Sequence, residues 1–389
     1  MAFDRGQGED REANYTSGVL SSLENLDWRS FLARPALPSP PPEALDALRQ
    51  KPILISGAGG SIGSALALRL GALMPPKLVL LEASESNLYA LERAWATSCT
   101  ASPKPPILVP ILGSVADRAL LEEIFATHAP QIVFHSAAFK HVPLMEQQPL
   151  AAIRNNIFAT GTLVQVALGH SARVVLLSTD KAVASASMMG ATKRVAEQIV
   201  LAYGGTALRL GNVLASRDSV AEVFAHQIAQ GGPVTVTDPA ARRYFLTLDE
   251  AVNLLLMVAA HQKPSALFAP VLPATHIIAD LARFMARELR PEREIGLTFT
   301  GPRPGDKQTE ELWSAGDRIS ATSLDEMVLV ETILPAKAQL AERLASLRAA
   351  LDARNLRDAL THLHALVPDY TPSPALLALA SQCGPRVCL

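Results

Sequence analysis

Six short apolar runs recur along residues 52–211, and they constrain the fold of this chain more than any other feature of its sequence. The runs are PILISG, KLVLLE, PILVPIL, QIVFHS, ARVVLLS and TALRLG, at residues 52–57, 77–82, 106–112, 131–136, 172–178 and 206–211. They lack the alternation of apolar and polar residues that half-exposed strands show, which is typical of parallel strands buried on both faces. The intervals leave room for helices. The sequence therefore predicts an α/β fold with a Rossmann-type doubly wound parallel sheet.

Changes in composition and in the pattern of apolar residues divide the chain into four parts. They are an N-terminal arm or linker (1–50), a nucleotide-binding Rossmann domain (51–211, joined by 246–271), a smaller α/β substrate-binding region (212–318) and a helical tail (319–389). Four prolines between Pro38 and Pro42 disfavour a helix or a central strand, which is why the first part is predicted to be a linker. Residues 334–366 have the pattern of a helix pair.

Composition excludes several classes of protein. The 389 residues include 35 Lys+Arg and 37 Asp+Glu, and this near-neutral balance argues against a protein that coats nucleic acid or anionic lipid. The 3 cysteines are too few and too scattered for a disulfide scaffold or a zinc site, so no metal is expected. The N-terminus lacks the apolar stretch of a signal peptide, and no apolar run reaches the roughly 18 residues of a membrane span. We expect a cytoplasmic protein.

A glycine-rich turn follows the first predicted strand and begins a helix. Gly57, Gly60 and Gly63 are spaced so that the backbone can turn sharply and approach a pyrophosphate, which the free N–H groups of Ser61 and Ile62 at the helix start would attract. A plain connection between strand and helix is the alternative reading. The next strand ends in Glu82, where a carboxylate would bind the ribose hydroxyls of NAD and repel the 2′-phosphate of NADP. Glu82 could instead be a solvated charge, and Ser84 beside it could reshape the pocket.

Reactive side chains follow two later strands. Lys140 lies in a stretch after 131–136, and Asp180 and Lys181 come directly after 172–178. Because ligands of open α/β sheets bind beyond the carboxyl ends of the strands, these residues are expected to face the nucleotide. Asp180 and Lys181 could act as a general acid and a general base, whereas a surface ion pair is the simpler alternative.

With these motifs the sequence resembles a known family, the nucleotide-sugar 4,6-dehydratases of the extended short-chain dehydrogenase/reductases. The stretches that carry the resemblance are GAGGSIGS, LLEASESNLYALE, VFHSAAFKHVPLME, STDKAV, MGATKR, RLGNVLASRDSV, GGPVTVTDP, RRYFLT and TGPRPGDKQTEEL, in that order. They cover roughly residues 51–315 and resemble the UDP-N-acetylglucosamine group of polysaccharide-biosynthesis or capsule proteins. LDWRSFLARPALP and VPDYTPS are similar to the linker and tail of the long, membrane-anchored branch, and we expect this chain to lack the anchor.

The resemblance implies an NAD-dependent elimination on a UDP-sugar. Hydride leaves sugar C4, the C5 proton and the C6 hydroxyl are lost as water, and hydride returns to C6. Asp180 is then expected to be the acid at the C6 oxygen and Lys181 the base at C5. Thr179, with Ser178 as a substitute, would hydrogen-bond the C4 oxygen, and Lys140 would orient the substrate or support the Asp180–Lys181 pair.

One position departs from the general pattern of the superfamily. Most short-chain dehydrogenases have Tyr-x-x-x-Lys, with both side chains on one helix face, and this chain has Met189 and Lys193 instead. A thioether cannot transfer a proton, so the C4 proton must leave by another route. The long branch of the family also has methionine here. Lys193 is expected to hold the nicotinamide ribose. The resemblance adds three further cofactor contacts, which are Ser114, Val115 and Ala137.

The resemblance also suggests residues that bind the substrate. Arginine forks suit diphosphate oxygens, and Arg217, Arg243 and Arg303 fall in the matched motifs, although each could be a surface ion pair. Three further candidates are Glu310 for the uridine ribose, Asn212 for the diphosphate or sugar, and Asn156 as a supporting asparagine. A UDP-sugar 4-epimerase or reductase, and a regulator that binds nucleotide sugar without chemistry, remain as alternatives. A homo-oligomer is expected by analogy.

Overall fold

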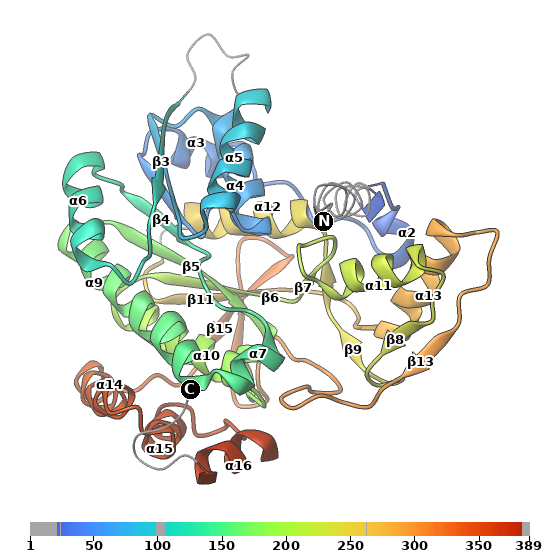
Figure 1. Cartoon of the computed structure of the whole chain (residues 1–389). Helices are drawn as coiled ribbons and strands as arrows, with labels where there is room; N and C mark the ends of the chain where they lie inside the picture. Colours follow the sequence, from blue (N-terminus) through green and yellow to red (C-terminus); the bar gives the residue numbers. More distant parts are fainter. Residues whose placement is uncertain (1–21, 24, 99–105, 262, 383–389) are drawn as a thin grey trace, which may run out of the picture.

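A nine-stranded sheet runs through the protein, and its order in space differs from its order along the chain (Figure 1). The computed structural model describes residues 22–23, 25–98, 106–261 and 263–382. The strands, in spatial order, are β14 (Arg318–Ala321), β15 (Met327–Glu331), β11 (Ala266–Pro270), β6 (Thr206–Leu210), β5 (Arg173–Thr179), β4 (Ile132–His135), β1 (Ile53–Ser56), β2 (Lys77–Glu82) and β3 (Ile107–Leu112). From β11 to β3 all neighbours are parallel. The predicted doubly wound sheet is confirmed.

Helices cover both faces of the sheet. One face carries α4 (Ser61–Leu73), α5 (Glu85–Ser98) and α12 (Leu248–Ala260), and the other carries α6 (Arg118–His128), α9 (Thr160–Gly169) and α10 (Met188–Ala202). A π-helical stretch, η1 (Ile153–Ala159), leads directly into α9. Within the described ranges, no helix combines the length and apolarity that crossing a bilayer requires.

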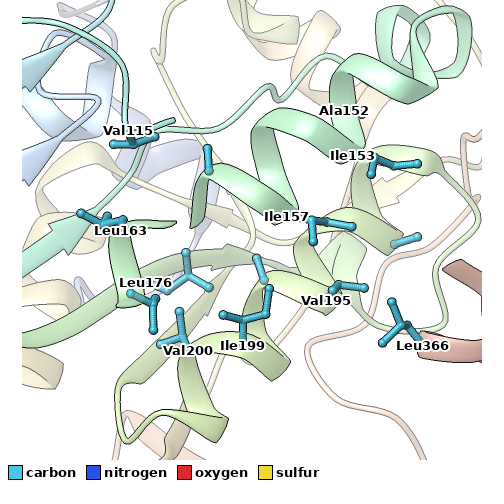
Figure 2. Close-up of a cluster of buried hydrophobic side chains, with 14 of the residues drawn as sticks. Val115, Ala152, Ile153, Ile157, Leu163, Leu176, Val195, Ile199, Val200 and Leu366 are labelled. Carbon is cyan, nitrogen blue, oxygen red and sulfur yellow. The ribbon is translucent and has the colours of Figure 1, made fainter. Parts of the chain in front are cut away.

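Each face of the sheet has its own apolar core. Figure 2 shows part of the core beneath α9 and α10, where Ile157, Val195 and Ile199 lie close to Leu176 of β5. Leu366, from the C-terminal part of the chain, reaches the same core. The helix that carries Met189 and Lys193 is therefore buried between the sheet and the tail, which restricts how its side chains can move.

The structure corrects the start of the helical tail. Residues 318–331 form β14 and β15, which extend the sheet in antiparallel orientation, with Phe268 of β11 opposite Leu329 of β15. The helices of the tail are α14 (Lys337–Asp352), α15 (Leu356–Leu366) and α16 (Pro374–Gln382), of which the first two are the predicted pair. The β-branched run in β15 suits a strand, and the added hairpin protects what would otherwise be the open edge of β11.

The described part of the predicted N-terminal arm, residues 22–23 and 25–50, is packed rather than free, and the rest of the arm lies outside the described residues. This part contains α2 (Trp28–Leu32) and α3 (Pro42–Arg49). Trp28 stacks near Phe284, and the guanidinium of Arg34 donates to both oxygens of Glu250, at 2.6 and 2.8 Å. Pro42 is the first residue of α3, a position where its missing N–H costs no hydrogen bond, so the proline run ends in a helix instead of excluding one.

The region assigned to substrate binding forms a third, smaller core beside the sheet. It is built from α11 (Val220–Ala229), α13 (Ile278–Leu289), β8 (Val234–Val236) and β13 (Leu297–Phe299). Short pairings tie it to the large sheet, because β7 (Asn212–Val213) directly follows β6 and pairs with β10 (Phe245–Leu246). Residues around Asn212 therefore lie where the two parts of the molecule meet.

Candidate active site

The glycine-rich turn between β1 and α4 is closely surrounded by backbone. Gly57 has a φ of 68°, and a Cβ there would lie 2.7 Å from the backbone N and Cα of Ala137. A Cβ on Gly63 would lie 2.2 Å from the carbonyl oxygen of Gly57. Only glycine fits at both positions. The turn consequently lies directly against Ala137, one of the predicted cofactor contacts, in the loop after β4.

The start of α4 has the properties of an anion site. Gly60 is its N-cap residue and supplies no side-chain hydrogen bond to the first turn. The backbone N–H groups of Ser61, Ile62 and Gly63 are therefore left for a ligand, at the end of the helix where the dipole attracts negative charge. These residues fit the pyrophosphate of a dinucleotide cofactor.

Glu82, at the end of β2, binds the same turn. One carboxylate oxygen accepts from the backbone N–H of Gly59 at 2.8 Å, and the other accepts from the N–H of Ser84 at 2.9 Å. Glu82 is 8% exposed, so it is not the solvated charge that the alternative reading allowed. Carboxylate oxygens have further lone pairs, and the remaining ones can accept from ribose hydroxyls.

The other predicted adenosine contacts lie one strand further on. Ser114 is exposed and its hydroxyl accepts from the backbone N–H of Ala116 at 3.2 Å, whereas Val115 is buried in the core of the sheet. Ser114 is therefore accessible beside β3, while Val115 could contact an adenine only through a small movement or its backbone.

Lys193 lies at the predicted position on α10, one helical turn after Met189. Its Nζ donates to the carbonyl of Leu177 at 2.5 Å, and both Lys193 and Met189 are buried. Burial lowers the pKa of Lys193 to about 8, against the opposing effect of Glu197. Met189 provides no donor or acid, so the proton of the C4 hydroxyl cannot pass through this side chain.

Thr179, Asp180, Lys181 and Asn212 come together at the carboxyl ends of β5 and β6. Lys181 Nζ donates to Asp180 Oδ1 at 2.9 Å and to Asn212 Oδ1 at 3.0 Å, and Thr179 Oγ1 donates to Asp180 Oδ1 at 2.9 Å. The side chain of Asp180 is 0% exposed and that of Lys181 is 20% exposed. Asp180 Oδ2 is buried without a hydrogen-bond partner. This is the oxygen that could carry the proton of an acid.

Tyr244 belongs to this site and was not identified from the sequence. Its backbone carbonyl accepts from the N–H of Asn212 at 2.8 Å, and a Cβ on Gly211 would lie 2.7 Å from the Cβ of Tyr244. Burial, together with the charges of Glu311 and Asp180, raises the pKa of Tyr244. A neutral phenol therefore lies near Asp180. Tyr244 lies in the RRYFLT stretch that carries the family resemblance, but only Arg243 of that stretch was predicted to be a site residue.

Ser178 cannot substitute for Thr179. Its hydroxyl donates to Glu197 at 2.6 Å, in a buried network where Arg209 donates to both Glu197 oxygens at 2.9 Å. Burial alone would raise the pKa of Glu197, but Arg209 outweighs it, and the pKa lies at about 2. The strand end thus presents Thr179 to the site and directs Ser178 into the core, as alternation along a strand requires.

Asn156 and Lys140 both bond to backbone groups in this structure. The amide of Asn156 is buried; it accepts from the backbone N–H of Phe139 at 2.8 Å and donates to Phe139 O at 3.0 Å and Thr192 Oγ1 at 3.1 Å. It holds the loop after β4. The Nζ of Lys140 donates to the carbonyl of Arg217 rather than to Asp180 or Lys181. Burial lowers the pKa of Lys140.

The three arginines predicted for the diphosphate have different surroundings. Arg217 lies on the glycine-rich turn, where its N–H donates to Ser61 Oγ at 2.9 Å. Arg243 donates to the carbonyl of Lys307 at 2.8 Å, and the side chain of Arg303 is 56% exposed and pairs with Asp306 at 3.0 Å. The three arginines thus have separate partners in this structure, and Arg217 contacts the glycine-rich turn.

Glu310 is buried between two cations. Its side chain is 3% exposed, with Oε2 2.9 Å from Lys307 Nζ and Oε1 3.9 Å from Arg243 Nε. Lys307 also donates to the carbonyl of Val183 at 3.0 Å, so it links this loop to the turn after Lys181. Lys307 was not identified from the sequence, although it lies in TGPRPGDK. A group of three metal-ligating side chains does not occur among the described residues.

Comparison with known proteins places this geometry in a family. The profile of the polysaccharide biosynthesis protein family matches residues 53–332. The chain is 39% identical over 274 residues to the capsular polysaccharide biosynthesis protein CapD of Staphylococcus aureus, a match that covers 68% of this chain and 45% of that protein. The chain thus spans less than half the length of this curated relative.

Two further similarities concern enzymes of nucleotide-sugar metabolism. A UDP-glucose 4-epimerase of Rickettsia canadensis is 32% identical, over 70% of this chain and 81% of the relative. Among solved structures, the dTDP-glucose 4,6-dehydratase DesIV of Streptomyces venezuelae, with NAD bound, superposes with a TM-score of 0.57 at 19% identity, covering 67% of this chain and 87% of that one. The last similarity concerns the fold alone.

Proposed function

This chain belongs to the polysaccharide biosynthesis protein family, a group of extended short-chain dehydrogenase/reductases, and on that premise we propose that it is an NAD-dependent nucleotide-sugar 4,6-dehydratase. The substrate we propose is UDP-N-acetylglucosamine or a close UDP-N-acetylhexosamine, and the product is the UDP-4-keto-6-deoxy sugar. Production of precursors for a surface polysaccharide agrees with the name of the Staphylococcus aureus relative.

The contact between Asp180 and Lys181 carries this proposal. The two side chains lie 2.9 Å apart at the end of β5, with Asn212 on the far side of Lys181. Exchange of configuration at C4 requires only oxidation and reduction, whereas loss of water across C5 and C6 requires an acid and a base side by side. An acid–base pair next to a cofactor turn is therefore better matched to dehydration.

Each side chain has a role in the proposed reaction. Lys181 takes the proton from C5 and gives it back to C5 once C6 has been reduced. Asp180 gives the proton that its Oδ2 can carry to the leaving C6 oxygen, which departs as water. Thr179 hydrogen-bonds the oxygen on C4. Asp180 is fully covered in this structure, so substrate binding must move the side chains above it. Once those side chains have moved, the bound substrate itself would exclude water from Asp180 while the cofactor is reduced.

The cofactor that these residues fit is NAD. When bound, it would accept hydride from C4 and return hydride to C6. The first-turn N–H groups of α4 would hold its pyrophosphate, Glu82 its adenosine ribose and Lys193 its nicotinamide ribose. Because the Glu82 carboxylate is held at the turn by the N–H groups of Gly59 and Ser84, it would repel the extra phosphate of NADP.

The uridine diphosphate would bind on the other side of the acid–base pair. Arg243, Arg303 and Glu310 remain our candidates there, and Lys307 joins them because it connects Glu310 to the turn after Lys181. Asn212 would affect the position of the sugar indirectly, because its Oδ1 accepts a hydrogen bond from Lys181 Nζ. A homo-oligomer and a cytoplasmic location are further parts of the proposal, which light scattering and cell fractionation would test.

The direct test is turnover of UDP-N-acetylglucosamine by the purified chain. The mass of the sugar nucleotide should fall by one water and a new C6 methyl signal should appear by NMR. Unchanged mass with inverted C4 would support a 4-epimerase, the candidate that the name of the Rickettsia canadensis relative favours. Unchanged substrate with tight NAD binding would contradict both and leave a nucleotide-sugar-binding regulator.

A further inference from the structure

The tail segment, residues 367–373 between α15 and α16, lies against the polypeptide that carries the acid–base pair. The backbone N–H of Thr371 donates to the carbonyl of Ser185 at 2.9 Å, and Ser373 Oγ donates to Glu146 Oε2 at 2.6 Å. Ser373 is 6% exposed, and Glu146 is 227 positions earlier in the chain. The Ser373–Glu146 contact is buried, and both contacts lie outside the site described above.

Glu146 connects two helix N-termini through its two oxygens. Oε1 accepts from the backbone N–H of Met188, the first residue of α10, at 2.7 Å. Oε2 accepts from Ser373 Oγ, which in turn accepts from the N–H of Leu376 in α16 at 3.2 Å. Glu146 is 5% exposed. A carboxylate next to the positive end of a helix dipole is favourable, so this arrangement fixes the first turn of α10 to the tail.

The second contact leads to Lys181. Ser185 Oγ donates to the carbonyl of Lys181 at 3.1 Å, while the Ser185 carbonyl is held by Thr371. A Cβ on Gly190 would lie 2.1 Å from the carbonyl oxygen of Lys181, so α10 packs directly on that peptide. Any shift of the first turn of α10 would therefore move the backbone of Lys181.

Apolar side chains of the tail also pack into the core. Leu366, Val367, Tyr370 and Leu376 all lie in the core beneath α10 and are at most 2% exposed. The Thr371 bond ends on the carbonyl of Ser185, and the Ser373 bond ends on the Glu146 carboxylate, which in turn accepts from the N–H of Met188. Such bonds determine position more than total stability.

We propose that Ser373 is a positioning residue. It acts through Glu146 to fix the first turn of α10 and the adjoining Asp180–Lys181 segment in position relative to the glycine-rich turn at residues 57–63. This inference rests on the proposed dehydratase function for its kinetic part. The structural part, that the tail segment holds residues 181–190, does not depend on any substrate.

The test uses three variants of the full chain: Ser373→Ala, Ser373→Thr and Ser381→Ala. Ser381 is an exposed serine of α16 whose hydroxyl bonds only locally, to Ala378 O at 2.7 Å, and it provides the matched control. Ser373→Ala should increase hydrogen exchange of the amides in residues 181–190 about fivefold, the effect of losing one buried hydrogen bond. Threonine keeps the hydroxyl and should restore the protection.

Kinetics give the second measurement. Ser373→Ala should lower kcat for UDP-N-acetylglucosamine about tenfold, because a small misplacement of reacting groups has a large cost, with KM and NAD affinity within about twofold of the parent. Unchanged exchange in residues 181–190, or faster exchange with unchanged kcat, would overturn the proposal. If the parent chain does not turn over this substrate, the proposed function fails, and the exchange measurement still decides whether the tail segment holds the loop.

Discussion

The backbone N–H of Arg217 donates to the hydroxyl of Ser61 at 2.9 Å, although the two residues are 156 positions apart in the chain. The guanidinium of Arg217 also lies 3.3 Å from Gly59 O and 3.3 Å from Asn87 Oδ1. A residue expected at the sugar diphosphate therefore closes over the cofactor turn. This contact joins the loop after β7 to the turn between β1 and α4.

Arg217→Ala should weaken NAD binding, with Kd rising about three- to tenfold. The substitution removes a positive charge beside the proposed pyrophosphate site, one hydrogen bond to Gly59 of the turn and one to Asn87 of α5. A charge-assisted contact of this kind is worth about 1 kcal/mol. Isothermal titration with NAD gives the Kd directly. Arg303→Ala is the control, because Arg303 is exposed and paired with Asp306. A larger effect on the KM for the sugar nucleotide than on the Kd for NAD would show that Arg217 binds the substrate and not the cofactor.

Asp180→Asn and Lys181→Met should each lower kcat by a factor of about 10² to 10⁴, the usual contribution of a general acid or base. Both changes keep the approximate volume of the side chain. Because neither residue contacts the cofactor turn, NAD affinity should stay within about twofold of the parent. Single-turnover kinetics with UDP-N-acetylglucosamine measures the chemical step. A variant with normal turnover would show that the affected residue is neither acid nor base.

The fold could be read from the sequence because buried parallel strands have a simple signature. The run at 77–82 coincides with β2, and the strand that ends at Thr179 carries Asp180 and Lys181 to the carboxyl edge of the sheet, as the position of the motif predicts. The proximity of Lys181 to Asn212 follows from the adjacency of β5 and β6, which the doubly wound topology implies.

The direction of long side chains could not be read in the same way. Lys140 and Arg217 lie in motifs that match the family, yet each bonds to backbone groups that only the folded chain brings near. Asn156 lies inside the π-helical stretch η1, whose turns are wider than those of an α-helix. The hydrophobic periodicity of the sequence did not reveal this stretch. Tyr244 was missed for a related reason, since the short pairing of β7 with β10 has too few residues to give a pattern.

Arg209→Met should destabilise the protein by about 3–5 kcal/mol, because it leaves the Glu197 carboxylate buried without its bidentate partner. Arg194 also pairs with Glu197, at 3.0 Å, and this pair would remain in the variant. The remaining pair is the reason that the destabilisation could be as small as the lower end of that range. Urea unfolding gives the free energy. Arg283→Met is the control, since Arg283 forms an exposed pair with Asp280 and its loss should cost less than about 1 kcal/mol. Equal losses in the two variants would contradict a structural role for Arg209.

His135, at the end of β4, should make the protein sensitive to mild acid. Its Nδ1 lies 2.7 Å from Ser56 Oγ and its Nε2 lies 2.8 Å from Thr160 Oγ1. Thr160 Oγ1 already donates to the carbonyl of Asn156, so it accepts from Nε2–H, and Nδ1 accepts from Ser56. The ring is therefore neutral and fully bonded. Burial, assisted by the charge of Lys193, lowers the pKa of His135 from 6.5 to about 3.

The sign of the pH effect follows from that shift. Between pH 6.5 and 3 the unfolded chain binds a proton at His135 that the folded chain does not, so stability is complete above pH 6.5 and falls as the pH falls. At pH 5 the loss should be about 2 kcal/mol. Urea unfolding of the parent and of His135→Asn at pH 7.5 and pH 5 measures it, since asparagine does not titrate and should lack this part of the decrease. The same decrease in both proteins would show that His135 is not the group responsible.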